Sequence, residues 1–160
     1  MTTNKSALLA CIRERLEAEL AAIKAAALAT HADATDDESK AEGKYDTRGL
    51  EASYLAHGQS KAAEEAAIAV AQFQALVPRD FAPGERVGLG ALVGLEGAAT
   101  TLYFIGPRAG GTEVEHGGRR VMVITPQSPL GRQLVGKVEG DSVQVELAGR
   151  RASFRVAAVT

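Results

Sequence analysis

Six carboxylates crowd into one short stretch of the chain, HADATDDESKAEGKYD at residues 31–46. They are Asp33, Asp36, Asp37, Glu38, Glu42 and Asp46. Carboxylates do chemistry either by holding a hard cation or by moving protons. Mg²⁺ commonly takes only one or two protein carboxylates, while waters and substrate phosphates supply the other ligands. The stretch is therefore either a solvated loop or a charged tip that completes a metal site belonging mostly to another molecule.

The other reactive residue types lack the spacing that catalysis or metal binding needs. His31, His57 and His116 show no ligand spacing with one another or with Cys11, so no zinc site is predicted. The glycines of VGLGALVG at 87–94 are spaced one residue too widely for a dinucleotide fingerprint, and a strand pattern follows. No Gly-x-Ser-x-Gly motif or phosphate-cradling loop is present. The sequence offers no candidate for nucleophilic catalysis, and we expect a protein that is not itself an enzyme.

Composition and cysteine usage indicate a globular protein of a reducing compartment. The 160 residues are 46% hydrophobic and 24% charged, and Cys11 is alone, which rules out a disulfide framework. The apolar run before Cys11 is shorter than the roughly 7–15 residues of a signal peptide. No run approaches the ~20 apolar residues of a membrane span. We expect a cytoplasmic protein without membrane contact.

The two halves of the chain differ in charge. Residues 1–80 hold 9 basic and 13 acidic side chains, a net charge of −4, whereas residues 81–160 hold 9 and 7, a net charge of +2. This asymmetry argues against wholesale nucleic-acid binding by the first half.

Two long helices are predicted on either side of the acidic stretch. In the first, apolar residues follow steps of three and four: Leu9, Ile12, Leu16, Leu20, Ile23 and Ala27. The second has a heptad seam of Leu55, Ala62, Ala69 and Leu76, with Gln59, Ala66 and Phe73 four residues after the first three. A narrow stripe cannot be buried by one helix, so helices over about 5–30 and 47–76 should fold back as an antiparallel coiled coil. The acidic stretch would then be a tip roughly 40 Å from the base.

Beyond this pair the pattern changes to strands. Pro78 and Pro83 break the helix and separate a helical domain, 1–77, from a β-rich domain, 78–160. Strands are predicted at 87–95, at 100–106 and 119–125 around a glycine-rich turn, and at 141–147 and 151–159 as a final hairpin around Ala148-Gly149. One helix interrupts them, with Ser128 as its N-cap and Gly136 at its end. The predicted fold class is α+β.

One segment of this second half carries a specific motif. Its residues are Ser128-Pro129-Leu130-Gly131-Arg132, then Leu134, Gly136-Lys137, Gly140-Asp141, Val143 and Val145, followed by a hairpin. The segment 124–159 resembles the C-terminal domain of the GreA/GreB (Gre) transcript-cleavage factors of bacterial RNA polymerase. That family joins an N-terminal antiparallel coiled coil to an FKBP-like domain in this order. The resemblance therefore extends over the whole chain.

What the resemblance implies is docking of the second domain at the mouth of the polymerase secondary channel, with the helical finger inside. The candidate docking residues are Ser128, Pro129, Arg132 and Lys137. Arg132 either binds the partner or satisfies carbonyls of its own domain. The other implied partner is nascent RNA, indirectly, and the chain is expected to be a monomer.

For the tip, the resemblance implies acids that stabilise a second Mg²⁺ of the polymerase and orient water to cut backtracked RNA. The candidates are Asp36, Asp37, Glu38, Asp46 and Glu51. The chain would hold no cofactor of its own and would share this Mg²⁺ with the polymerase. Two metals roughly 3.5–4 Å apart suit such a phosphoryl site.

Two alternatives stay open. The family has an Asp and a Glu three residues apart at the tip, whereas Gly49 lies three residues after Asp46 here. Asp33-x-x-Asp36 is instead similar to the tip of DksA-type regulators of initiation, which use the same channel without stimulating cleavage. The second alternative is an FKBP-like prolyl isomerase or chaperone. That activity needs an aromatic-lined pocket, and the aromatic residues available are Tyr103, Phe104 and Phe154.

Overall fold

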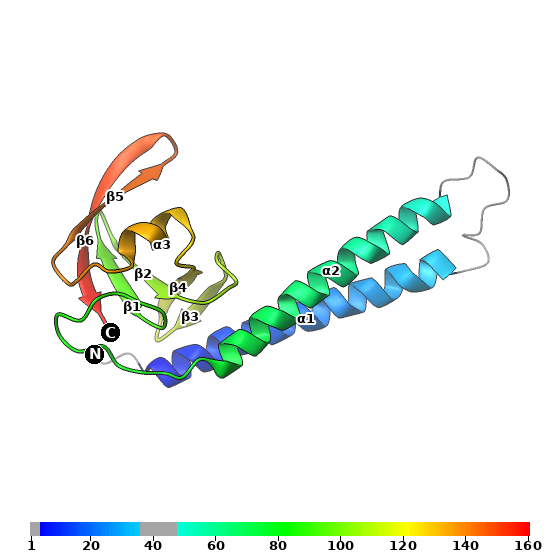
Figure 1. Ribbon diagram of the computed structural model, residues 1–160, viewed down its shortest axis with the longest axis horizontal. Coiled ribbons are helices and arrows are strands. Elements are labelled where there is room, and N and C mark those ends of the chain that lie inside the picture. The colour runs from blue at the N-terminus through cyan, green and yellow to red at the C-terminus, as the bar shows by residue number, and fades with distance from the viewer. Residues whose placement is uncertain (1–3, 36–47) are drawn as a thin grey trace. The chain divides into compact units, whose positions relative to one another are not determined.

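The computed structural model describes residues 4–35 and 48–160 and has an α+β architecture (Figure 1). Its helices are α1 (Lys5–Thr35), α2 (Arg48–Ala75) and α3 (Pro129–Leu134), and its strands are β1 (Leu92–Glu96), β2 (Thr100–Ile105), β3 (Glu113–His116), β4 (Arg119–Ile124), β5 (Ser142–Leu147) and β6 (Arg150–Val159). The chain divides into two compact units, one formed by Met1–Glu14 with Ala71–Thr160 and the other by Arg15–Val70. Within the described residues, none of the helices combines the length and apolar character that a membrane span requires.

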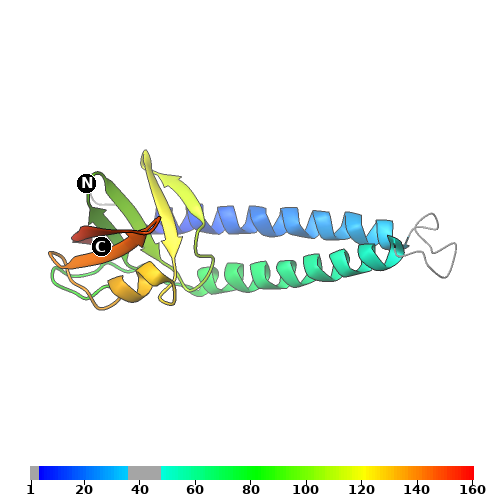
Figure 2. The ribbon, with the colours of Figure 1, turned by 90° about the horizontal axis from the view of Figure 1, so that it is seen from above.

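The unit Arg15–Val70 is a helical hairpin in which the two helices run antiparallel, side by side in both views (Figures 1 and 2). The predicted stripe on α1 is confirmed, since Leu16 is buried and Leu20 and Ile23 are half-buried. On α2 the heptad prediction is confirmed at Ala69, which is buried, and at Leu76, which is half-buried. Ala62 is exposed instead, next to the half-buried Ala63, and the side chain of Leu55 lies outside the description.

The exposure of Ala62 has a physical origin in the local composition. Around the predicted row, α2 reads SKAAEEAAIAV, in which adjacent alanines can occupy either of two neighbouring stripes at similar cost. Gln59, Ala66 and Phe73 do lie on the less exposed side, as the heptad predicts. The spacing therefore located both rows, and among their described side chains Ala62 is the exposed exception.

Six strands form one mixed sheet in the order β3-β4-β2-β1-β6-β5. All neighbouring strands are antiparallel except β2 and β4, which pair in parallel with Leu102 opposite Val121. The parallel pair is possible because the chain runs back along β3 between them. The prediction of a plain turn over 107–118 is wrong at this point. In GGTEVEHGG only Val114 is apolar, too little alternation to indicate a strand.

The start and the end of the sheet follow local backbone rules. The strand predicted from residue 87 begins at Leu92 instead, because Gly88 and Ala91 close a turn with Gly90 at φ +85°. At the other end, Ala148 and Gly149 have φ values of 51° and 75°. Two successive positive φ values define the hairpin turn that suits twisted strands. The predicted β5–β6 hairpin is confirmed.

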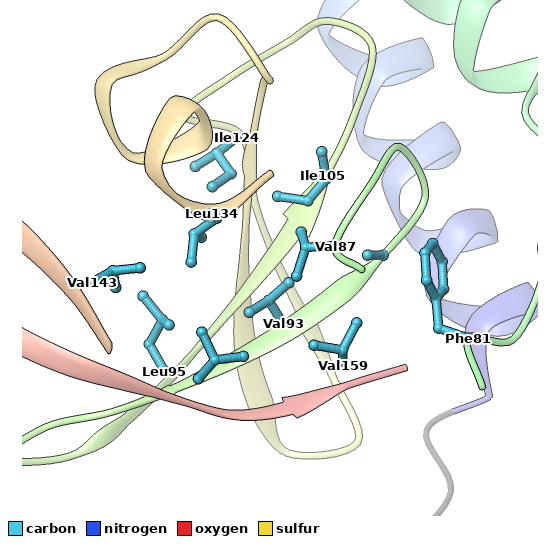
Figure 3. Close-up of a cluster of buried hydrophobic side chains, with 11 residues drawn as sticks. Phe81, Val87, Val93, Leu95, Ile105, Ile124, Leu134, Val143 and Val159 are labelled. Atoms are coloured by element: carbon cyan, nitrogen blue, oxygen red, sulfur yellow. The ribbon is translucent and has the colours of Figure 1, made fainter. Parts of the chain in front are cut away.

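One face of the sheet packs on α3 and the preceding loop (Figure 3). The buried cluster consists of Phe81, Val87, Ala91, Val93, Leu95, Ile105, Ile124, Leu134, Val143, Val156 and Val159. Val93 and Leu95 alternate along β1, so their side chains point to the same face. Leu134 from α3 closes this core from the side opposite the sheet.

Part of the opposite face of the sheet, on β1, β2 and β4, is buried as well. Because neighbours on a strand alternate, Leu102 and Phe104 point away from the Ile105 side of β2, and both are buried. The Phe104 ring lies 6.3 Å from the ring of Phe73 in α2. A Cβ on Gly106 would come within 2.6 Å of Phe73 and 2.9 Å of Val123, so this close approach requires glycine. The end of α2 therefore covers the part of the second face around Phe104 and Gly106.

Phe73→Ala is expected to lower the free energy of unfolding by about 3–5 kcal/mol, because it leaves a cavity beside Phe104. Gln72→Ala, at an exposed neighbouring position, should change it by less than about 0.5 kcal/mol. Chemical denaturation of the full chain measures both. Equal losses in the two variants would contradict the packing of Phe73 on the sheet.

The first turns of α1 are tied to the segment that follows α2. The side chain of Arg13 donates from Nε to the carbonyl of Phe73 (3.0 Å) and from Nη2 to that of Leu76 (2.9 Å). Carbonyls at the end of a helix have no partner within it, so this contact satisfies them. Lys5 is 5% exposed, and its Nζ donates to the carbonyl of Arg79 (2.6 Å) and lies 4.6 Å from the centre of the Phe81 ring.

Burial lowers the pKa of Lys5 from 10.5 to about 8, although the carboxylates of Asp80 and Glu85 act in the opposite direction. The charged form is therefore disfavoured in the folded state. Between pH 8 and pH 10.5 the folded protein binds fewer protons than the unfolded chain, so the free energy of unfolding rises with pH there. As the pH falls through 8, this contribution is lost.

We expect the free energy of unfolding of the wild type, measured relative to Lys5→Met, to rise by about 1–2 kcal/mol between pH 7 and pH 9.5. Methionine keeps an apolar chain at this position but cannot titrate. Other ionisable groups are common to both proteins, so their contributions cancel in the difference. Parallel pH profiles would show that Lys5 titrates as it does in water.

Candidate docking site

Ser128 and Pro129 build the start of helix α3. Ser128 has extended φ and ψ of −65° and 156°, and its Oγ accepts a hydrogen bond from the N–H of Gly131 (3.0 Å). The same hydroxyl donates to the carbonyl of Thr125 (2.8 Å). Pro129 occupies the first turn, where no N–H is needed. The predicted N-cap is confirmed, and it fixes the point at which the chain leaves the sheet.

Gly131 is required by a close approach of two backbone segments. A Cβ at this position would lie 1.8 Å from the carbonyl oxygen of Thr125, which no side chain can accommodate. Gly136, with φ +86°, follows the helix and takes the left-handed conformation common after a helix end. Two glycines of the motif thus set how α3 begins and where it ends.

A cavity of about 390 Å³ opens beside this helix. Its lining residues are Leu95, Thr101, Tyr103, Met122, Ile124, Ser128, Pro129, Leu130, Val145, Glu146 and Phe154. Apolar side chains predominate, with Glu146 as the one carboxylate among those lining residues. Burial raises the pKa of the Tyr103 hydroxyl, which therefore stays neutral and able to donate a hydrogen bond at physiological pH. Such a cavity suits an apolar side chain or ligand with a few polar contacts.

The four candidate docking residues fall on two different surfaces. Ser128 and Pro129 line the cavity, whereas Arg132 and Lys137 do not. Arg132 is exposed, and among the described residues its side chain has no hydrogen bond or ion pair. It therefore satisfies no carbonyl in this part of the chain. Lys137 is half-buried, and its backbone carbonyl accepts from the N–H of Val87 (2.8 Å).

The candidate tip acids are not part of this site. Asp36, Asp37, Glu38 and Asp46 lie outside the described residues. Glu51 belongs to α2, and its side chain is likewise outside the description. Where the structure is described, no three His, Cys, Asp or Glu side chains come together as a metal site.

The sequence did not indicate two of the contacts. Cys11 Sγ lies 3.9 Å from His116 Nδ1, which joins α1 to the end of β3. The aromatic residues named for a pocket also separate, because Tyr103 and Phe154 line the cavity while Phe104 packs on Phe73. Alternation along TLYF could have separated Tyr103 from Phe104. Nothing in the spacing relates Cys11 to a residue more than 100 positions away.

The comparison with protein families places the chain among transcription elongation factors. Residues 82–160 match the model described as "Transcription elongation factor, GreA/GreB, C-term". This match spans the whole sheet and α3, including the Ser128–Gly131 cap. Residues 82–160 therefore belong to the C-terminal domain of the GreA/GreB family. No curated protein sequence matches it.

Solved structures of Gfh1 and GreA/GreB proteins are similar to this chain at low sequence identity. "Structure of the transcription factor Gfh1" has 24% identity, covers 93% of each chain and has a TM-score of 0.41. A GreA factor homolog 1 (Gfh1) protein of Thermus thermophilus has 21% identity, covers 92% of this chain and 94% of its own, and has a TM-score of 0.39. A GreA/GreB elongation factor from Nitrosomonas europaea has 19% identity, coverages of 69% and 92%, and a TM-score of 0.38. Since these TM-scores are below 0.5, the family assignment rests on the match over residues 82–160.

Ser128→Ala is expected to lower the free energy of unfolding by about 1 kcal/mol, because the N–H of Gly131 loses its acceptor and the carbonyl of Thr125 keeps only the backbone N–H of residue 128 as a donor. Arg132→Ala, at an exposed position in the same helix, should change it by less than about 0.5 kcal/mol. Urea denaturation of the full chain compares them. A loss for Arg132→Ala as large as for Ser128→Ala would mean that Arg132 supports the domain itself.

Proposed function

We propose that this protein binds bacterial RNA polymerase in its secondary channel and modulates elongation. The single observation that carries the proposal is the family match over residues 82–160, which coincides with the sheet, α3 and the cavity. The helical hairpin supplies a second element of suitable form. Two antiparallel helices form a narrow structure whose connecting stretch can reach into a channel.

The C-terminal domain is proposed to dock through the cavity beside α3. Its lining combines Leu130, Met122 and Phe154 with the hydroxyl of Tyr103, so an apolar side chain of the polymerase would lose contact with water on entering it. Ser128 and Pro129 are proposed to act here by holding α3 against the sheet as well as by lining the cavity. Arg132 and Lys137 would contact the polymerase outside the cavity.

The acids between the helices are proposed to work next to the polymerase Mg²⁺. Asp36, Asp37, Glu38 and Asp46 carry the hard oxygen donors that Mg²⁺ prefers, and Glu51 is a fifth candidate. Near the polymerase active site these carboxylates would stabilise the ion and orient water for cleavage of backtracked RNA. The protein itself would bind nascent RNA only indirectly.

Two other functions are weighed against this one. A regulator of initiation of the DksA type would use the same channel without stimulating cleavage. A prolyl isomerase or chaperone is favoured by one observation, since the rings of Tyr103 and Phe154 both line the cavity. Shortening of the transcript supports the proposed Gre-like function, and an effect confined to promoter complexes supports a DksA-type regulator. Catalysed isomerisation of a proline peptide, without polymerase binding, supports a prolyl isomerase or chaperone.

The deciding experiment adds the full chain to a stalled elongation complex and scores both binding and 3′ shortening of the transcript. Replacing Asp36, Asp37, Glu38 and Asp46 by Asn or Gln keeps their size and removes the charge. The effect on transcription should fall tenfold or more, which corresponds to a lost contact of about 1.4 kcal/mol. Affinity should fall only modestly, because the other domain supplies most of the contact.

The matched control replaces two exposed acids of the helices, Glu14 and Glu64, by Gln. This control should act on transcription as the wild type does. If the four-site variant also acts as the wild type does, the acids only solvate a loop. If the wild type fails to bind the complex at all, the proposed function is wrong.

A further inference from the structure

Two segments of the C-terminal domain carry a surface that the cavity does not include. We call it the basic patch, and its residues are Arg86, Leu89, Arg132, Val135 and Lys137. The segments are hydrogen-bonded to each other, since the N–H of Val87 donates to the carbonyl of Lys137 (2.8 Å) and the N–H of Gly136 to that of Val87 (2.8 Å). Arg86 Nη1 also donates to the Gly136 carbonyl (3.0 Å). None of the five patch residues lines the cavity.

Positive charge in this patch is only partly compensated. Among the described residues, the side chains of Arg132 and Lys137 have no carboxylate or carbonyl partner. The nearby acids are engaged elsewhere: Glu85 binds Arg79 (2.7 Å) and the N–H of Ala82 (2.8 Å). Asp141 accepts from the N–H of Val138 (2.9 Å). One exposed acid, Glu139, follows Lys137 by two residues, so these segments carry more cations than uncommitted carboxylates.

The same segments expose two large apolar side chains. Leu89 is 46% exposed and Val135 is 40% exposed. Leu89 stands in the turn closed by the hydrogen bond from Ala91 to Gly88 (3.1 Å), and Val135 follows the last residue of α3. Both positions are fixed by backbone hydrogen bonds, so their exposure follows from the fold. Covering either side chain with an apolar partner would remove apolar surface from water and so stabilise the complex.

Cations beside apolar side chains fit an acidic protein segment better than a nucleic acid. Interfaces with nucleic acids are strongly polar and depend on phosphate contacts. Exposed aliphatic side chains add little to such contacts, whereas a protein segment with both carboxylates and apolar residues matches both features of the patch. The charge of the patch then selects an acidic partner, and Leu89 and Val135 supply burial.

We propose that the basic patch binds an acidic segment of the polymerase that also presents apolar side chains, as a second contact beside the cavity. This inference rests on the proposed function, because polymerase is the partner it names. Two surfaces on one rigid domain bind together more strongly than either alone, since the second contact forms at high effective concentration. They also fix the orientation in which the domain docks.

The test measures binding of the full chain to RNA polymerase at about 50 and 200 mM salt. Arg132→Glu with Lys137→Glu should weaken binding at least tenfold at the lower salt and flatten the salt dependence. Arg119→Glu with Arg150→Glu is the matched control: it makes the same charge change at two exposed strand positions and should weaken binding less than threefold. Leu89→Ser with Val135→Ser should also weaken binding, with the salt dependence of the wild type retained.

Thermal unfolding of each variant checks that the fold is kept. The patch proposal is overturned if the patch and control charge reversals weaken binding equally, or if neither patch variant weakens it. It is also overturned if polymerase affinity is kept while binding of a labelled single-stranded RNA by the wild type is lost in the charge-reversed variant. If the wild type does not bind polymerase, both the proposed function and the patch proposal are wrong. If every variant binds as the wild type does, only the patch proposal is wrong.

Discussion

The packing of Phe73 against Phe104 and Gly106 is the contact on which the rest of the C-terminal unit depends. It joins the end of α2 to the sheet at Gly106, where the side chains of Phe73 and Val123 leave no space for a Cβ. A six-stranded sheet with one face open to water would expose Leu102, Phe104 and Val123, all of which are buried here. The helix end therefore completes the domain. This explains why residues 1–14 and 71–160 form one compact unit although a proline-rich segment separates helix from sheet in the sequence.

Much of the fold could be predicted from the sequence because local signals were strong. The residue types at Ser128, Pro129 and Gly136 predicted α3, and Ala148-Gly149 predicted a hairpin. Contacts between residues far apart in the sequence were not predicted. The contact of Cys11 with His116 and the parallel pairing of β2 with β4 depend on which segments meet in space, and spacing along the chain does not encode that. On α2 the alanines made two seams nearly equivalent, so periodicity alone could not choose between Ala62 and Ala63.

The candidate site shows a different limit of sequence reasoning. Family motifs mix residues that build a structure with residues that meet a partner, and sequence treats both alike. In S-P-L-G-R, the serine caps a helix, the proline starts it and the glycine allows a close approach of 1.8 Å. Pro129, Leu130 and Arg132 also have side chains that another molecule can contact. Pro129 and Leu130 line the cavity, and Arg132 lies outside it. The motif thus places residues of both the cavity and the basic patch on one short helix.

The cavity and the basic patch would contribute differently to the specificity of docking. The cavity is mainly apolar, and apolar burial stabilises many partners without distinguishing them well. The patch around Arg132 and Lys137 is charged, and charge complementarity selects partners and speeds encounter more than it adds affinity. The Ser128 hydroxyl and the close approach at Gly131 tie the start of α3 to Thr125, and this one helix carries residues of both surfaces. In the proposed docking, a partner would have to match both an apolar site and a basic site. That geometric requirement is stricter than either contact alone.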